Sequence, residues 1–331
     1  MKKWKGFDKE NLPSNEYKRK LYPNFDISKL HESTAYVSEY DDCERPIKEF
    51  YETFKKNHDI LKNNCNHNNG PKCCRDVNYY IDLLTGIIKE SSLEYGDKKK
   101  LIKHLEDFWE PTLRAKNIYT CERETDKDSS RKRCILQHLY DLKEDEKSIL
   151  SFPEKYKNYL SEKWKNIISY TDAKAATLYI KIENNSMGII ENYANFLDSS
   201  DYICDNNLDE LSTDDITIST DVNSFINTIS LNRISPNLGK RICYNKPYVD
   251  MLKYKASNIQ RINNALSIGI ALLGFFLILI FLYEFSPLRN RLRRYTKKKI
   301  EVDENVKDEM PQLYENSENG RPYISYNIVS H

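Results

Sequence analysis

The residues of this 331-residue chain that are best suited to chemistry are its cysteines. A cysteine sulfur either pairs in a disulfide or, as a thiolate, binds a metal such as zinc. All of them precede a long apolar segment, and an even number on one side of a membrane indicates an oxidising compartment on that side. The eight candidates for disulfide pairing are Cys43, Cys65, Cys73, Cys74, Cys121, Cys134, Cys204 and Cys243.

One group of these residues also raises a metal alternative. Cys65, His67, Cys73 and Cys74 carry the donor atoms of a tetrahedral zinc site, but their spacing matches no recognised zinc finger. Adjacent cysteines more often direct each sulfur to a different partner. We therefore predict disulfides here and no metal site.

The sequence contains no recognisable catalytic arrangement. None of its six histidines stands in an HExxH or a similar motif, and the nine scattered glycines form neither a phosphate-binding loop nor a dinucleotide fingerprint. We expect a non-enzymatic protein with no catalytic residue, cofactor or small-molecule substrate. The 51 basic and 50 acidic side chains balance, so nucleic acid is not an expected partner either.

The apolar segment Ala265–Tyr283 has the length and composition of a transmembrane helix. Its 19 residues carry no charge, and 13 of them are Leu, Ile or Phe. At about 1.5 Å per residue the segment spans about 28 Å, close to the thickness of a bilayer core. The alternative is a buried helix of a soluble core, but such helices seldom stay apolar around their whole circumference. The lipid bilayer is therefore the first expected partner.

A dense basic cluster follows this segment, with seven cations in eleven residues. By the positive-inside rule it predicts a cytosolic C-terminus and an extracytoplasmic N-terminal domain. The same cations also suit contact with anionic lipid head groups. The N-terminal sequence offers no apolar stretch for a signal peptide, so the membrane helix is expected to direct insertion itself. The basic residues are Arg289, Arg291, Arg293, Arg294, Lys297, Lys298 and Lys299.

Apolar residues before the membrane segment recur at helical spacing, which predicts an all-α fold built as a helical bundle. Disulfides are expected to link its helices. The clearest helical spacing joins Val77, Tyr80, Ile81, Leu84, Ile87 and Ile88. One helix is expected to have Pro46 in its first turn, and another is expected to end at Pro111. Less regular spacing predicts a sixth helix over Ile180–Leu197, and only Ile216–Ser219 reads as extended. Trp109 and Trp164 are expected in the core, whereas Trp4 is left unassigned.

These patterns divide the chain into successive parts. The expected parts are an N-terminal segment (1–40), a cysteine-containing helical domain (41–204), an acidic Ser/Thr-rich loop (205–221), a juxtamembrane helical region (222–264), the transmembrane helix (265–283) and a short basic cytoplasmic tail (284–331). The sequon Asn184-Asn185-Ser186 fits N-glycosylation, but in so asparagine-rich a chain we attribute it to chance.

Several motifs together resemble the Plasmodium interspersed repeat family of variant antigens, and most closely its vir-like branch. They are LPSNEYKRKLY at Leu12–Tyr22, CILQHLYDLK from Cys134, the late Cys204 and Cys243, the membrane helix with its basic run, and the closing RPYISYNIVSH. The resemblance spans nearly the whole chain. It implies a variant surface antigen of a malaria parasite, without enzyme activity, in an exported membrane or at the surface of the infected red cell.

The resemblance implies a host receptor or an antibody as partner. It also implies a role in immune evasion and host-cell adhesion. The alternative is an exported single-pass membrane protein with a structural or trafficking role that works through its basic tail. Exposure of the N-terminal domain at the cell surface would favour the antigen over the structural or trafficking role.

Overall fold

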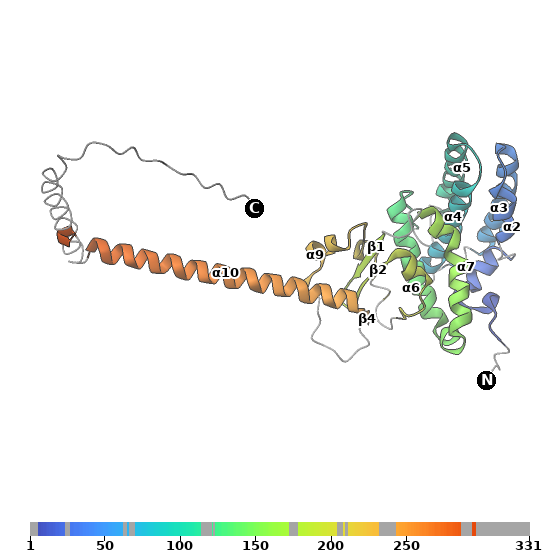
Figure 1. The fold of residues 1–331 in the computed structure, drawn as a ribbon. Coiled ribbons are helices and arrows are strands. Elements are labelled where there is room, and N and C mark those ends of the chain that lie inside the picture. The colour runs from blue at the N-terminus through green and yellow to red at the C-terminus, as the bar shows by residue number, and fades with distance from the viewer. Residues whose placement is uncertain are drawn as a thin grey trace, which may run out of the picture. The chain divides into compact units, whose positions relative to one another are not determined.

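The computed structural model describes residues 6–23, 27–61, 65, 70–113, 121, 123–171, 178–203, 208, 211–231, 243–285 and 293–295. Contacts divide the chain into two units, Met1–Ala256 and Ser257–His331. The order of the elements is drawn in Figure 1. The described residues are mostly helical, as the sequence predicts.

Helices make up the described part of the first unit up to Thr171. The short ones are the 3-10 helices η1 (Lys9–Asn11) and η2 (Pro13–Asn15), and α1 (Glu16–Leu21) and α2 (Ser28–Ala35). The long ones are α3 (Tyr40–Leu61), α4 (Gly70–Glu90), α5 (Tyr95–Leu113), α6 (Lys127–Ser151) and α7 (Pro153–Thr171).

Helix α4 is the centre of this bundle. It packs against α1, α2, α5, α6 and α7, and its predicted apolar stripe is buried. The two helix boundaries inferred from proline are displaced. Pro46 lies inside α3, which begins at Tyr40, and α5 continues past Pro111 to Leu113. Tertiary packing extends a helix through a proline when the lost hydrogen bond is outweighed by buried surface.

The predicted sixth helix is wrong, so the described residues are mostly helical but not all-α. Residues 179–198 form strands β1 (Tyr179–Glu183) and β2 (Met187–Asn192), followed by the short helix α8 (Tyr193–Asp198). Leu178, Ile180 and Ile182 alternate with other residues, which is the spacing of a strand rather than a helix.

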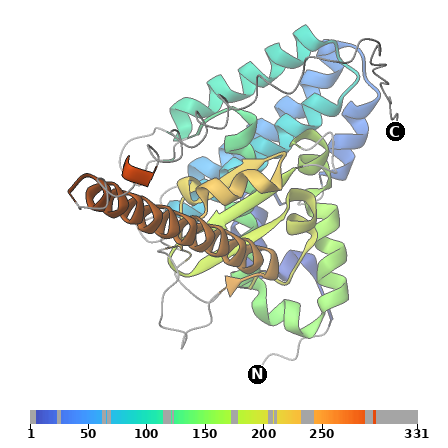
Figure 2. The same ribbon diagram turned by 60° about the vertical axis from the view of Figure 1, so that its left-hand side comes forward.

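A four-stranded sheet with the order β3-β1-β2-β4 results. Strand β3 (Ile216–Ser219), which the sequence marked as extended, pairs antiparallel with β1, as does β2. Strand β4 (Cys243–Tyr244) pairs parallel with β2 and so comes from a distant part of the sequence. The strands can be followed in Figure 2. The 3-10 helices η5 (Thr213–Asp215) and η6 (Val222–Ser224) and helix α9 (Phe225–Thr228) lie between β2 and β4 in the chain.

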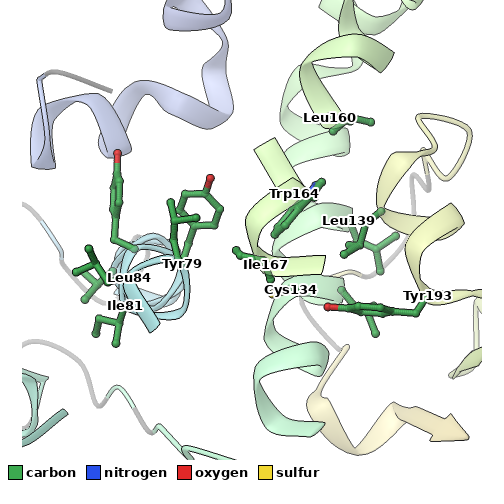
Figure 3. Packing of buried hydrophobic residues seen from close by; sticks show 14 of the residues in the cluster. Tyr79, Ile81, Leu84, Cys134, Leu139, Leu160, Trp164, Ile167 and Tyr193 are labelled. Atoms are coloured by element: carbon green, nitrogen blue, oxygen red, sulfur yellow. The ribbon is translucent and has the colours of Figure 1, made fainter. Parts of the chain in front are cut away.

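The main core joins the helices to one face of the sheet. Trp109 and Trp164 are 1% and 0% exposed, which confirms their predicted place in the core. Figure 3 shows Trp164 and Ile167 of α7 packed beside residues of α6 and α8. A second, smaller cluster lies on the other face of the sheet, where Ile190 meets Phe225 and Tyr248. Neighbouring residues Ile189 and Ile190 thus enter different clusters, because successive strand residues point to opposite faces.

Helix α10 (Lys246–Phe285) contains the predicted transmembrane segment. Its first residues belong to the first unit, in which Tyr248 and Leu252 are buried. The residues from Ser257 onward belong to the second unit. A helix of 40 residues is longer than the 19-residue apolar segment alone requires, so the segment continues an element that begins in the folded domain.

Candidate functional site

The apolar half of α10 is the part of the molecule that most clearly requires a partner. In the described residues one helix is long and apolar enough to cross a membrane, with a mean hydropathy of 2.8 over a window of which none is buried. Its leucine, isoleucine and phenylalanine side chains are exposed all along Leu266–Leu282. A buried core helix, the alternative weighed from sequence, would be covered by other elements. An apolar surface of this extent instead suits contact with lipid.

The basic cluster after α10 is only partly described. Arg293 and Arg294 are exposed. The other five cations, Arg289, Arg291, Lys297, Lys298 and Lys299, lie outside the described residues, as does the tail that follows them. Contact of the cluster with lipid head groups therefore stays a prediction.

Two disulfides attach the start of α4 to neighbouring segments of the chain. Cys65–Cys73, with Cα atoms 6.1 Å apart, joins it to the segment after α3, and Cys74–Cys121, at 5.5 Å, joins it to the segment before α6. The adjacent cysteines thus direct their sulfurs to different partners, as expected from sequence. Since a disulfide sulfur is not a thiolate, these three residues of the zinc alternative are unsuited to binding the metal. His67 lies outside the described residues.

For two cysteines the predicted disulfide is wrong. Among the described residues, Cys43 of α3 and Cys134 of α6 are free and buried thiols. Burial raises the pKa of both, so they stay protonated and unreactive at neutral pH. Their neighbours are core side chains, with Ser91 near Cys43 and Tyr193 near Cys134. Cys243 is disulfide-bonded, and Cys204 lies outside the described residues.

A buried ionic network holds the N-terminal segment against α6 and α7. The Lys18 ammonium donates to both Asp141 carboxylate oxygens at 3.0 and 3.1 Å and lies 3.4 Å from Asp76. Lys163 of α7 is a second cation on Asp141. These four side chains are almost completely buried, so each charge depends on the others for compensation.

The pKa shifts in this network follow from that compensation. Burial by itself lowers the pKa of Lys18, but the carboxylates of Asp141 and Asp76 outweigh it and raise that pKa well above its usual value. Burial likewise raises the pKa of Asp141, but Lys163 and Lys18 hold it well below the usual range. Lys18 and Asp141 are therefore charged at neutral pH, and their ion pair fixes the first unit's N-terminal segment in place.

Two residues near Lys18 extend the attachment. Asp145 accepts hydrogen bonds from the backbone N–H and the hydroxyl of Ser14, at 3.0 and 2.6 Å. The Asn15 amide donates to the Tyr159 hydroxyl at 2.8 Å. Ser14, Asn15 and Lys18 all belong to the Leu12–Tyr22 motif, which therefore has a structural role in this chain.

A second buried network links α4, α5 and α6. Arg123 and Arg133 both pair with Asp82, at 2.9 and 2.8 Å, and Arg123 also pairs with Glu106 at 2.8 Å. Burial tends to raise the pKa of Asp82, but the two guanidinium groups lower it overall. This cluster holds the chain just after Cys121, beside the second disulfide.

A third set of contacts attaches the start of α10 to the sheet. Glu183 of β1 pairs with Lys181, and one of its carboxylate oxygens accepts from the Tyr248 hydroxyl at 3.1 Å. The Asn245 side chain bonds to the backbone of Ile190 in both directions, at 3.1 and 2.8 Å, as a neighbouring strand would. A Cβ at Gly188 would overlap the rings of Tyr248 and Tyr244. The base of α10 is thus fixed within the first unit.

The sequon lies in the turn between β1 and β2. Asn184 is 8% exposed, and its side-chain oxygen accepts from the Ser186 backbone N–H and hydroxyl at 2.9 and 3.3 Å. Its side chain stabilises the turn, which is a common role of asparagine.

Sequence reasoning missed the ionic networks and the sheet contacts. The alternation from Leu178 to Ile182 and the turn residues after it were a signal for the hairpin. Lys18, Asp82 and Asp141 gave no such signal, because charged residues on helices are usually exposed.

No family model, curated protein or solved structure matches this chain. Its candidate function therefore has to rest on its own residues.

Proposed function

We propose that this chain is a variant surface antigen of a malaria parasite, which displays a disulfide-linked helical domain from a single membrane helix. The observation that carries the proposal is the exposed apolar part of α10, which follows directly on a folded domain with buried polar networks. The parasite and antigen parts of the proposal rest on the sequence motifs described above. Its expected partners are the bilayer and a host receptor or antibody.

The orientation of the domain is argued from its disulfides and the basic run. Disulfides persist outside the cytosol, and the cations after α10 favour a cytosolic C-terminus. Both arguments support a first unit on the extracytoplasmic side. No chemical step is proposed, because the buried charges described here neutralise one another and serve the fold.

Attachment of α10 to the sheet suits display. The contacts of Glu183 and Asn245 fix the first turns of the helix within the domain rather than through a loose linker. A host protein would therefore meet a domain whose membrane-proximal end is structurally defined.

Protease protection on intact infected red cells tests the proposal. The full chain would carry one tag before Leu12 and another after His331. We expect loss of the N-terminal tag and retention of the C-terminal tag, with both lost after permeabilisation. Protection of both tags in intact cells would contradict surface display, and it would favour the trafficking or structural role through the basic tail.

A matched variant tests the orientation argument. Replacing the seven cations after α10 by glutamine removes the charge bias but keeps the apolar segment. The expected result is a mixture of orientations, with part of the C-terminal tag exposed. An unchanged pattern would mean that another signal sets the orientation.

A further inference from the structure

A cavity of about 480 Å³ lies among η1, α2, α4 and α7, within the first unit. This volume is within the range of pockets that hold small organic ligands. Its lining residues are Lys9, Ile27, His31, Glu32, Tyr79, Tyr80, Leu83, Tyr159, Glu162, Lys163, Lys165 and Asn166. None of the functions considered so far uses this cavity.

Aromatic rings and aliphatic groups form one wall of the cavity. Tyr80, Leu83 and Tyr159 are each at most 5% exposed. The hydroxyls of Tyr80 and Tyr159 are already used, since they bond to the Lys18 carbonyl and to Asn15. The wall therefore offers flat apolar surface to a ligand rather than further hydrogen bonds.

Tyr79 differs from these tyrosines. It is 8% exposed, and its hydroxyl forms no hydrogen bond with any residue that the structure describes. Burial raises the pKa of this hydroxyl, so it remains a donor at neutral pH. The hydroxyl is reachable from the cavity rather than fully enclosed, so it can donate a hydrogen bond to an acceptor group placed there.

The charges around the cavity favour an anion on its α7 side. Lys163 is compensated by Asp141, and Lys9 lies 3.7 Å from Glu162. Lys165 of α7 is exposed and forms no ion pair with a described residue. Glu32 lies on α2, so an anionic group is favoured next to α7 rather than α2.

We propose that this cavity binds a small organic anion, in which a carboxylate or phosphate is joined to a flat apolar body. The anionic group accepts from the Tyr79 hydroxyl and the Lys165 ammonium. The apolar body packs against Tyr80, Leu83 and Tyr159. The ligand is bound without being converted, and the proposal is independent of which side of the membrane the domain occupies.

Titration calorimetry on the full chain in lipid nanodiscs tests this inference, with empty nanodiscs as the blank. The probes are 2-naphthoate, 2-naphthyl phosphate and the neutral 2-naphthamide. We expect saturable binding of at least one anion and none of the amide at the same concentrations. The preferred anion then tells whether the site suits a carboxylate or a phosphate.

Two variants locate the binding. Tyr79→Phe should weaken binding of the anion roughly tenfold or more, because it removes a hydrogen bond to a charged group. The matched control Tyr95→Phe changes an exposed tyrosine away from the cavity and should have no effect. Lys165→Glu should also weaken binding, whereas Lys143→Glu on α6 should not.

Several results would overturn the proposal. These are the absence of saturable binding of both anions, equal binding of the amide, or unchanged affinity in both Tyr79→Phe and Lys165→Glu. The near-ultraviolet circular dichroism of each variant would be recorded first. Since Lys165 is exposed, its variant is expected to fold and keeps the test decisive even if Tyr79→Phe does not fold.

Discussion

The helical part of the first unit (residues 12–171) and its sheet-containing part (178–256) are held together in different ways. The helical part uses two described disulfides and two buried ionic networks that connect helices. The sheet-containing part uses backbone pairing of distant strands, with a buried pair at Glu183, close packing at Gly188 and a disulfide at Cys243 of β4. In the first part ion pairs and disulfides connect helices that form locally, whereas in the second the strands pair only because distant residues meet.

The largest expected effect is on the Asp141 network. Asp141→Asn would leave the buried Lys18 and Lys163 without their shared counter-ion, which we expect to lower the free energy of unfolding by about 3–5 kcal/mol. Urea denaturation of the full chain in detergent micelles, followed by near-ultraviolet circular dichroism, measures this. The control Asp42→Asn breaks an exposed pair with Arg45 and should change stability by less than about 1 kcal/mol. Equal effects of the two variants would mean that the network does not stabilise the helical part.

The two disulfides should differ in their contribution to stability, according to the length of chain that each encloses. Removing Cys74–Cys121, with a sequence separation of 47, as a double alanine variant should cost about 4 kcal/mol on the chain-entropy estimate. Removing Cys65–Cys73, with a separation of 8, should cost about 2.5 kcal/mol. The same denaturation experiment ranks them. The reverse order would show that local packing, rather than loop closure, sets their contribution.

In the sheet-containing part a single methyl group should be enough to disturb the fold. Gly188→Ala places a Cβ against the rings of Tyr248 and Tyr244, and we expect it to cost about 1–3 kcal/mol by overpacking. Gly96→Ala is the control, because a Cβ there meets nothing within 4 Å. Thermal unfolding of both variants gives the comparison. If Gly188→Ala is as stable as Gly96→Ala, the contact between β2 and α10 is looser than described.

The smallest expected effect is on the acid dependence of the helical part. Because the folded-state pKa of Asp82 is lowered, its contribution is present above the unfolded pKa of about 4 and is lost as the pH falls through the folded value. Asp82→Asn should therefore flatten the fall in stability below pH about 4, measured by urea denaturation across that range. Burial raises the pKa of Asp145, so the contribution of this carboxyl to stability grows, rather than falls, as the pH is lowered. An unchanged slope in Asp82→Asn would assign the acid sensitivity to other carboxylates.

Local sequence pattern predicted much of the helical part. The stripe from Val77 to Ile88 is the buried face of α4, and the adjacent Cys73 and Cys74 pair with different partners. Periodicity reports these features because a helix repeats within a few residues along the chain. Of the candidate site, composition alone identified the apolar part of α10.

The remaining features depend on residues that are far apart in the sequence. Cys43 and Cys134 are free because core side chains surround them, and a count of cysteines contains no such information. The cavity beside Tyr79 likewise exists only where α2, α4 and α7 come together.

The sequence by itself determined the long helices up to Thr171 and the apolar segment of α10, since these depend on neighbouring side chains and on transfer from water. Only the tertiary structure decided that Lys18 and Asp141 are buried as a pair and that β4 lies beside β2. The physical reason is that a buried charge or a strand edge is stable only with its partner present, and those partners lie far away in the chain.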